Sequence, residues 1–152
     1  GYSGEIGHMC INFDGPVCTC GNRGCLETYA NMPVLLARLR QAAGRTVGTA
    51  DFAALQDDPA CEAVFRDTAD KLTVALVNAA NLFDPQCIFL GHDAALLPPR
   101  CLERIAGGLE RRTLAAGYQK IPLRRSAFGE KAPLLGSAAC ILDEIFSGRL
   151  GC

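Results

Sequence analysis

Three cysteines lie close together near the start of the chain, in the stretch GPVCTCGNRGCLE at residues 15–27, and a histidine precedes them by ten positions. Three thiolates and one imidazole make up a tetrahedral ligand set that zinc prefers. The glycines at positions 21 and 24 let a short loop turn the sulfur atoms toward one centre. The pattern therefore predicts a zinc site formed by His8, Cys18, Cys20 and Cys25.

The predicted zinc is structural. A closed set of four protein ligands leaves no open position for a reactive water molecule. A redox pair or a disulfide is the alternative for these thiols, but a CxC pair is strained and leaves the third cysteine unexplained. We therefore expect the metal to fix the geometry of the loop.

Two carboxylates flank the cysteine cluster. Glu5 lies three residues before His8, and Glu27 lies two residues after Cys25. Carboxylates beside a rigid loop can accept hydrogen bonds from the hydroxyl groups of a sugar. Glu27 can instead be a charge that stabilises the first turn of the following helix, and Glu5 a solvated loop residue. The residues alone leave both interpretations open.

Composition indicates one globular unit. The chain has 152 residues, 49% of them hydrophobic and 20% charged, which is ordinary for a single domain with its own core. A net charge of -1 provides no basic surface for nucleic acid. No run reaches the ~18 apolar residues of a membrane span, and the first residues lack a signal-peptide pattern, so we expect a cytoplasmic protein. Five further cysteines have apolar neighbours and are expected to be small buried hydrophobes: Cys10, Cys61, Cys87, Cys101 and Cys140.

Helices and short strands alternate along the chain. The segment HMCINFD at residues 8–14 has the composition of a strand. Helical spacing occupies residues 25–43, with a kink or restart at Pro33, and residues 59–83, about 99–109 and 133–146. Residues 87–91 and 120–126 are two further strands, the first of which we expect to be buried on both faces. This alternation predicts an α/β domain with a largely parallel sheet.

Four segments resemble the ROK family, which groups bacterial sugar repressors and sugar kinases. They are GEIGH at 4–8, GPVCTCGNRGCLE at 15–27, LFDPQCIFLG at 82–91 and APLLGSAACILDEIF at 132–146. The resemblance implies that the zinc ligands are His8, Cys18, Cys20 and Cys25. It also implies that the sugar site is lined by Glu5, His8 and Glu27.

The family fold implied by this resemblance is a two-lobed, actin-like or ribonuclease-H-like α/β architecture that binds sugar between its lobes. Residues 1–152 are then a C-terminal lobe with a zinc-bearing loop, without the N-terminal lobe or any DNA-binding domain. The family's phosphate motif and catalytic aspartate are absent from this sequence. Since phosphoryl transfer needs a positioned general base, we assign no catalytic residue and expect the chain alone to be inactive.

The residues after the second predicted strand bear on whether the chain resembles a repressor or a kinase. Kinases of the family carry a GGG sequence there, close to the nucleotide, whereas this chain has Gly91-His92-Asp93. Extra side chains and a negative charge disfavour a nucleotide, although an ordinary loop histidine is the simpler interpretation of His92 alone. The expected function is therefore a sugar-binding and zinc-binding effector domain of a repressor that contacts DNA through another domain.

Two alternatives remain open. The first is part of a sugar kinase that uses ATP and Mg²⁺, and the second is a structural, zinc-stabilised dimerisation module. In each case we expect a homo-oligomer, a dimer or larger, because unpaired strand edges recruit further chains.

Overall fold

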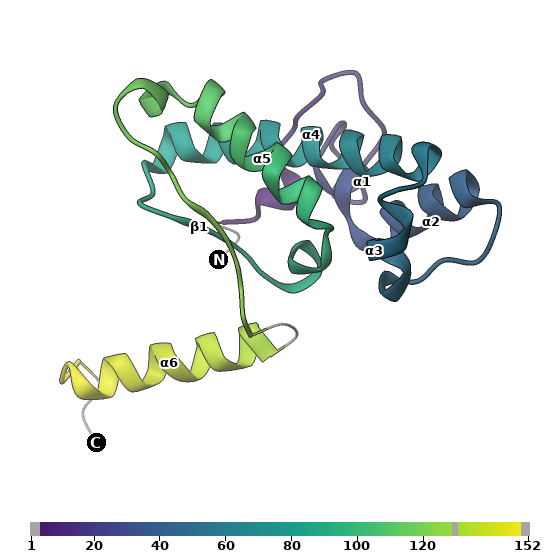
Figure 1. The fold of residues 1–152 in the computed structure, drawn as a ribbon. Coiled ribbons are helices and arrows are strands. Elements are labelled where there is room, and N and C mark those ends of the chain that lie inside the picture. The colour runs from purple at the N-terminus through teal and green to yellow at the C-terminus, as the bar shows by residue number, and fades with distance from the viewer. Residues whose placement is uncertain (1–3, 129–130, 150–152) are drawn as a thin grey trace.

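A long central helix and the helices packed against it form the body of the fold (Figure 1). The computed structural model describes residues 4–128 and 131–149. Helix α4 (Pro59–Phe83) packs against α2 (Met32–Ala43) on one side and against α5 (Pro99–Arg112) on the other. The buried side chains between these helices form one continuous hydrophobic core, which includes Leu35, Leu39, Phe65, Leu76, Ile105 and Leu109.

The ends of the long helices follow from local chemistry. The side chain of Asp58 accepts hydrogen bonds from the backbone N–H groups of Ala60 and Cys61, both at 2.9 Å, and so caps the start of α4. Gly44, at φ +63°, ends α2 in the left-handed conformation that glycine adopts without strain.

The predicted helix over residues 25–43 is two helices. Helix α1 (Glu27–Ala30) stops at Asn31, whose backbone is extended, and α2 begins at the next residue. The Asn31 side chain accepts a hydrogen bond of 2.8 Å from the N–H of Val34, and Pro33 lies in the first turn of α2. The expected restart is confirmed, and the cap at Asn31 fixes where it occurs.

Short helical turns connect these elements. They are η1 (Ile6–His8), η2 (Thr49–Asp51), α3 (Phe52–Leu55), η3 (His92–Leu96) and η4 (Leu114–Gly117). Phe52 of α3 packs edge-on against Phe65 of α4, with ring centroids 5.2 Å apart. This contact packs the segment between α2 and α4, residues 44–58, against the core.

Within the described residues the sheet has two parallel strands, β1 (Ile88–Leu90) and β2 (Leu123–Arg125), with Ile88 opposite Leu123. The parallel pairing is confirmed. The expectation that β1 is buried on both faces is wrong, because Phe89 is 63% exposed while its neighbour Leu90 is buried. The helices cover one face of this strand, and nothing in the described chain covers the side of Phe89.

The prediction of a strand at residues 8–14 is also wrong. His8 ends the turn η1, and Cys10 makes only an isolated antiparallel bridge with Cys25. Backbone groups of the segment bond instead to the turn that carries the cysteines, for example from the N–H of Ile11 to the oxygen of Gly24 at 2.8 Å. Since that partner is a turn, no ladder can form.

Helix α6 (Ala132–Phe146) lies apart from the body, after an extended segment that includes β2 (Figure 1). Gly148 follows it at φ +72° and caps it. Six large apolar side chains of this helix are exposed: Leu134, Leu135, Ile141, Leu142, Ile145 and Phe146. A helix with this composition ordinarily packs against another element.

Of the five further cysteines that the sequence predicts to be buried, two are buried. Cys61 and Cys101 are buried, as expected, whereas Cys87 is half-buried and Cys10 and Cys140 are exposed. None of the helices in residues 4–128 and 131–149 is long and apolar enough to cross a membrane.

Candidate metal centre

The four predicted ligands come from three neighbouring parts of the chain. His8 ends η1, Cys18 and Cys20 lie on the loop that follows, and Cys25 lies two residues before α1. The loop closes on itself through an antiparallel bridge between Val17 and Arg23 and a hydrogen bond of 2.8 Å from the Cys18 N–H to the Asn22 oxygen. These contacts hold the two halves of the loop together.

Glycine is required at position 24. Gly24 has φ +66°, and a Cβ atom there would lie 1.6 Å from the backbone oxygen of Asn12. Gly21 also has a positive φ, +91°, but a Cβ there would meet no atom within 4 Å. Both glycines turn the loop, as expected, and only Gly24 also lets another backbone segment approach closely.

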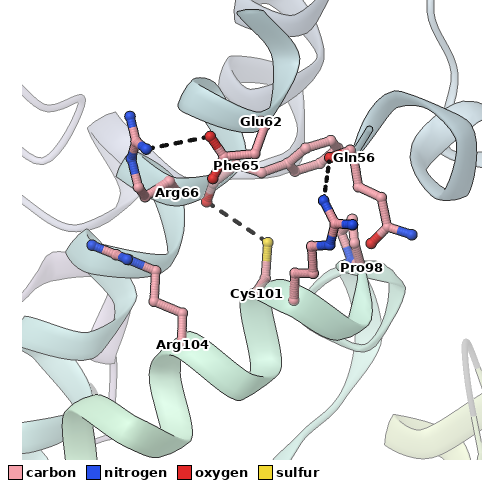
Figure 2. A pocket seen from close by; sticks show the side chains of 8 residues that line it. Gln56, Glu62, Phe65, Arg66, Pro98, Cys101 and Arg104 are labelled. Atoms are coloured by element: carbon pink, nitrogen blue, oxygen red, sulfur yellow. Dashed lines mark hydrogen bonds and ion pairs between the residues drawn. The ribbon is translucent and has the colours of Figure 1, made fainter. Parts of the chain in front are cut away.

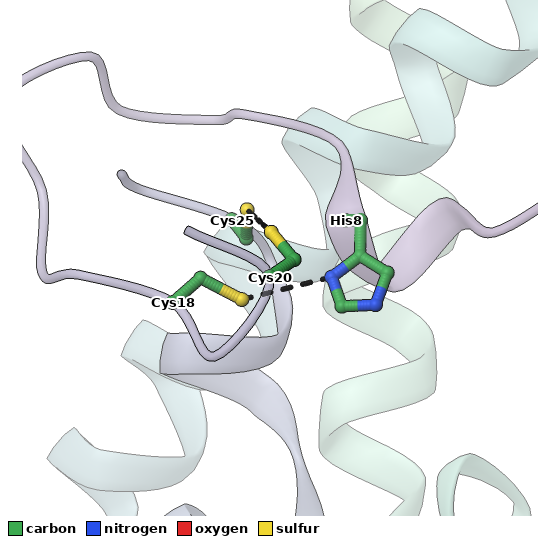
Figure 3. Close-up of side chains that lie close together, drawn as sticks. All are labelled: His8, Cys18, Cys20 and Cys25. Atoms are coloured by element: carbon green, nitrogen blue, oxygen red, sulfur yellow. Dashed lines mark hydrogen bonds between the residues drawn. The ribbon is translucent and has the colours of Figure 1, made fainter. Parts of the chain in front are cut away.

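The donor atoms of His8, Cys18, Cys20 and Cys25 all lie within 4.8 Å of one another (Figure 3). The Nδ1 atom of His8 is 3.6 Å from the sulfur of Cys18, and the sulfurs of Cys20 and Cys25 are 3.7 Å apart. Bonds of about 2.3 Å to sulfur and about 2.0 Å to nitrogen in a tetrahedron give separations of about 3.8 Å between sulfurs and about 3.5 Å between nitrogen and sulfur. The two measured separations are close to these values, and all four donors are near enough to one another to hold one metal ion.

The thiols of Cys18 and Cys25 differ in their pKa values. The pKa of Cys18 is lowered to about 7, chiefly by a hydrogen bond from the backbone of Cys20 and further by hydrogen bonds from the Cys20 and His8 side chains. Burial raises the pKa of Cys25 to about 12. The hydrogen bond with Cys18 raises the pKa of His8, against the effect of desolvation. Neighbouring thiols resist losing both protons, because two adjacent negative charges repel each other. A bound cation would stabilise them all as thiolates.

The carboxylates predicted to bind sugar lie beside this cluster. Oε1 of Glu27 accepts hydrogen bonds from the hydroxyl of Thr19 at 3.5 Å and from the thiol of Cys18 at 3.9 Å. Its other oxygen lies over Gly7, 3.8 Å from the point that a Cβ would occupy. Glu27 and Glu5 both raise the pKa of His8 through their charge. Both carboxylates are therefore near His8, but they line different hollows, Glu5 one with Met9 and Phe83 and Glu27 another with Gly7 and Leu26.

Glu27 also begins α1, so its charge lies in the first turn of that helix. The helix interpretation is met at this position, whereas sugar binding by the same carboxylate stays a prediction. The hydrogen bonds from Thr19 and Cys18 orient one oxygen toward the loop.

Sequence reasoning missed two residues that shape the site. Thr19, between the first two cysteines, bonds to Glu27. Tyr29 accepts a hydrogen bond of 3.0 Å from the Asn12 side chain, and its hydroxyl lies 2.2 Å from the point that a Cβ of residue 15 would occupy. Thr19 could have been found from the sequence, because its hydroxyl lies between two predicted ligands in GPVCTCG. Nothing in the sequence indicates the long-range contact of Tyr29.

The segment Gly91-His92-Asp93 lies at the end of β1 and opens η3. His92 has φ +47°, in the left-handed region that favours glycine. Its Nδ1 atom is 3.0 Å from a carboxylate oxygen of Asp93. The backbone thus keeps a glycine-like conformation while two side chains occupy the space outside it.

The profile of the ROK family matches residues 1–144, and the chain belongs to this family. It is 34% identical to the xylose repressor of Bacillus subtilis over 149 residues, which is 94% of this chain and 38% of that protein. Among solved structures, it superposes on a ROK hexokinase from Thermus thermophilus with a TM-score of 0.75 and 33% identity, over 91% of this chain and 47% of that one. A ROK transcriptional regulator described as a homologue of E. coli Mlc gives a TM-score of 0.68 and 27% identity, over 82% of this chain and 35% of that one.

The chain therefore spans less than half the length of each of these proteins. The family contains both repressors and kinases, and the comparisons include both.

Proposed function

We propose that the chain is the sugar-binding part of a ROK transcriptional repressor and that a structural zinc ion organises its site. The donor set supports this proposal, because three thiols and one imidazole lie within 4.8 Å of one another and two of their separations, 3.6 Å and 3.7 Å, are close to those of tetrahedral zinc. Four protein ligands would complete the tetrahedron. Within the proposal, residues 1–152 form the C-terminal lobe of the family's actin-like fold.

The metal ion would supply a rigid centre for the loop between Cys18 and Cys25. Fixing this loop fixes Thr19, which holds one oxygen of Glu27. Glu5, His8 and Glu27 can then accept or donate hydrogen bonds to the hydroxyl groups of a sugar without further ordering. DNA would be bound by another part of the protein, since this chain has a net charge of -1.

The sugar is proposed to be D-xylose, the sugar in the name of the B. subtilis relative. Calorimetric titration with D-xylose, and with D-glucose for comparison, tests the site. Glu27→Gln should weaken binding by about 1–3 kcal/mol, because a carboxylate makes stronger hydrogen bonds than an amide. Glu103→Gln, a change of the same kind at an exposed position of α5, serves as the control and should bind as the parent does. Equal affinity of the parent and Glu27→Gln for both sugars would assign Glu27 to the helix alone.

A sugar kinase is the second candidate, and the superposition on the ROK hexokinase favours it. That activity would need ATP and Mg²⁺. The left-handed His92 and its partner Asp93 oppose it, because they place an imidazole and a carboxylate after β1, where the family's kinases carry glycines. Titration with ATP and Mg²⁺ separates the two candidates: the repressor proposal expects no binding, and saturable binding would favour the kinase.

We also propose that the protein is a dimer or a larger homo-oligomer. The exposed apolar side chains of α6 and the exposed Phe89 of β1 support this, since such surfaces ordinarily become buried on association.

A further inference from the structure

The groove between α4 and α5 contains a hollow of about 210 Å³. Its wall on α5 is formed by Arg104, Gly108, Arg111 and Arg112, which recur at helical spacing along one face. Its wall on α4 includes Asp70 and Thr73, one turn apart. Three guanidinium groups and one carboxylate therefore face the same space.

Gly108 lines the hollow and lies next to a second glycine, Gly107. A Cβ on Gly108 would lie 2.3 Å from Cγ2 of Thr73, so the helices approach each other closely at this point. Gly107 has no side chain either, and Nη1 of Arg111 lies 3.0 Å from where its Cβ would be. The Arg111 side chain thus folds back over the preceding turn of α5.

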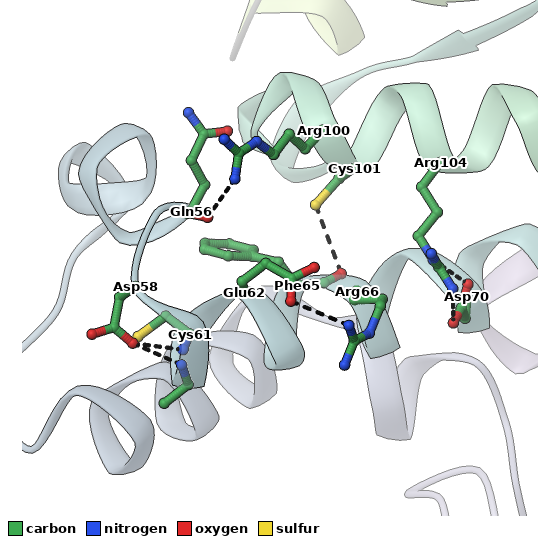
Figure 4. A network of polar contacts seen from close by, with 11 residues as sticks. Gln56, Asp58, Cys61, Glu62, Phe65, Arg66, Asp70, Arg100, Cys101 and Arg104 are labelled. Atoms are coloured by element: carbon green, nitrogen blue, oxygen red, sulfur yellow. Dashed lines mark hydrogen bonds and ion pairs between the residues drawn. The ribbon is translucent and has the colours of Figure 1, made fainter.

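The charges of the hollow are not balanced. Asp70 already receives two hydrogen bonds from Arg104, at 2.6 and 2.8 Å (Figure 4). These bonds are the main reason that the pKa of Asp70 is lowered, and the charges of Arg112 and Arg66 add to the effect. Arg111 and Arg112 make no side-chain hydrogen bond or ion pair with any residue in the described ranges. In the described part of the chain, Asp70 is thus the one carboxylate that lines the hollow with three arginines, and neither Arg111 nor Arg112 is hydrogen-bonded to it.

A second pocket in the same groove provides an internal comparison (Figure 2). It is also lined by three arginines, but each has its own carboxylate: Arg66 with Glu62 at 3.3 Å, Arg100 with Asp57 at 2.9 Å, and Arg104 with Asp70. The positive excess is thus confined to the C-terminal half of α5. Basic residues in a last turn also stabilise the helix dipole. Arg111, however, folds back over Gly107, away from the helix end.

We propose that this hollow binds a phosphate group, held by Arg111 and Arg112 with Arg104 at its edge. Guanidinium groups bind phosphate oxygens through paired, charge-assisted hydrogen bonds. The group is either inorganic phosphate or the phosphate of a small monoester, since the volume exceeds that of a single phosphate and has room for the rest of an ester. The site lies between α4 and α5, away from the cysteine cluster, and does not depend on the sugar or the metal.

Nuclear magnetic resonance of the full chain tests the site through the backbone amides of Gly107 and Gly108. Titration with sodium phosphate should shift both amides with a dissociation constant on the order of millimolar, whereas sodium chloride at equal ionic strength should not. Arg111→Gln and Arg112→Gln should each weaken the response about tenfold. Arg124→Gln, which removes an exposed arginine on β2, should leave it unchanged.

A parallel titration with glycerol 2-phosphate distinguishes the two sources, because tighter binding than that of phosphate indicates an ester ligand and weaker binding indicates the free ion. The proposal is overturned if phosphate shifts the two amides no more than chloride does. It is equally overturned if the response survives both Arg111→Gln and Arg112→Gln.

Discussion

The sulfur atoms of Cys20 and Cys25 lie 3.7 Å apart, and the two thiols are not joined by a disulfide. This separation is nearly twice the length of a disulfide bond, about 2.05 Å, and matches the distance between two sulfurs on one tetrahedral zinc, about 3.8 Å. Cys25 is buried against the start of α1, while Cys20 lies on the exposed side of the loop. A metal ion between them would join the loop to the helical body.

Replacing Cys20 with serine should release the metal and lower the stability of the protein. The hydroxyl is a poor zinc ligand, and the binding free energy of a structural site is part of the folding free energy. Elemental analysis should show loss of the metal, and the midpoint of thermal unfolding should fall by several degrees. Cys140→Ser, an exposed thiol on α6, is the matched control and should change neither quantity. A folded Cys20→Ser protein with a full complement of zinc would contradict the assignment.

Gly24→Ala should destabilise the protein more than Gly21→Ala. At position 24 the new methyl group would lie 1.6 Å from the Asn12 oxygen, so the loop must move, at a cost of at least about 2–3 kcal/mol. At position 21 the space is open and only the left-handed backbone is strained, at a cost of about 1–2 kcal/mol. Urea unfolding of the two variants measures the difference. Equal losses would mean that the close approach to Asn12 contributes nothing.

The pairing of Asp70 with Arg104 should make stability depend on pH. The hydrogen bonds from Arg104 lower the pKa of Asp70 below its value in the unfolded chain, about 3.9. The folded state therefore binds this proton less readily, and the stabilisation is fully present above about pH 5 and disappears as the pH falls through the folded-state pKa. Both groups are about half exposed, at 44% and 50%, so the effect is modest.

Urea unfolding of the parent and of Asp70→Asn at pH 7 and pH 3 measures this effect. The parent should be the more stable at pH 7, and the difference should shrink at pH 3. Metal loss at low pH affects both proteins alike and cancels in the comparison. A difference that stays constant with pH would show that the pair is fully screened by solvent.

The main helices and the donor set could be predicted from the sequence because both are encoded locally. Asp58-Pro59 and Gly44 mark helix ends through groups within a few residues, and the spacing of the cysteines contains the ligand set. The failures involve contacts between distant residues. The segment after His8 resembles a strand, but its partner is a turn, and the exposure of Phe89 depends on which elements cover β1. Alternating or apolar sequence does not specify either property.

The apolar surface of α6 should drive self-association. Light scattering at tens of micromolar, a range that detects weak association, should give the mass of a dimer or larger. Ile141→Lys together with Phe146→Lys should shift the protein toward the monomer, because both side chains are exposed, at 56% and 85%, and charge opposes their burial. Ala127→Lys, an exposed position before α6, is the control. A monomeric parent at these concentrations would contradict the proposal.

X-ray absorption at the zinc edge of the purified protein tests the central claim most directly. The account predicts one zinc per chain, with three sulfur neighbours at about 2.3 Å and one nitrogen at about 2.0 Å, and with no oxygen from water. This result would place His8, Cys18, Cys20 and Cys25 around a closed, structural metal ion beside Glu27. A folded protein without zinc, or a zinc ion with fewer than three sulfur neighbours, would contradict it.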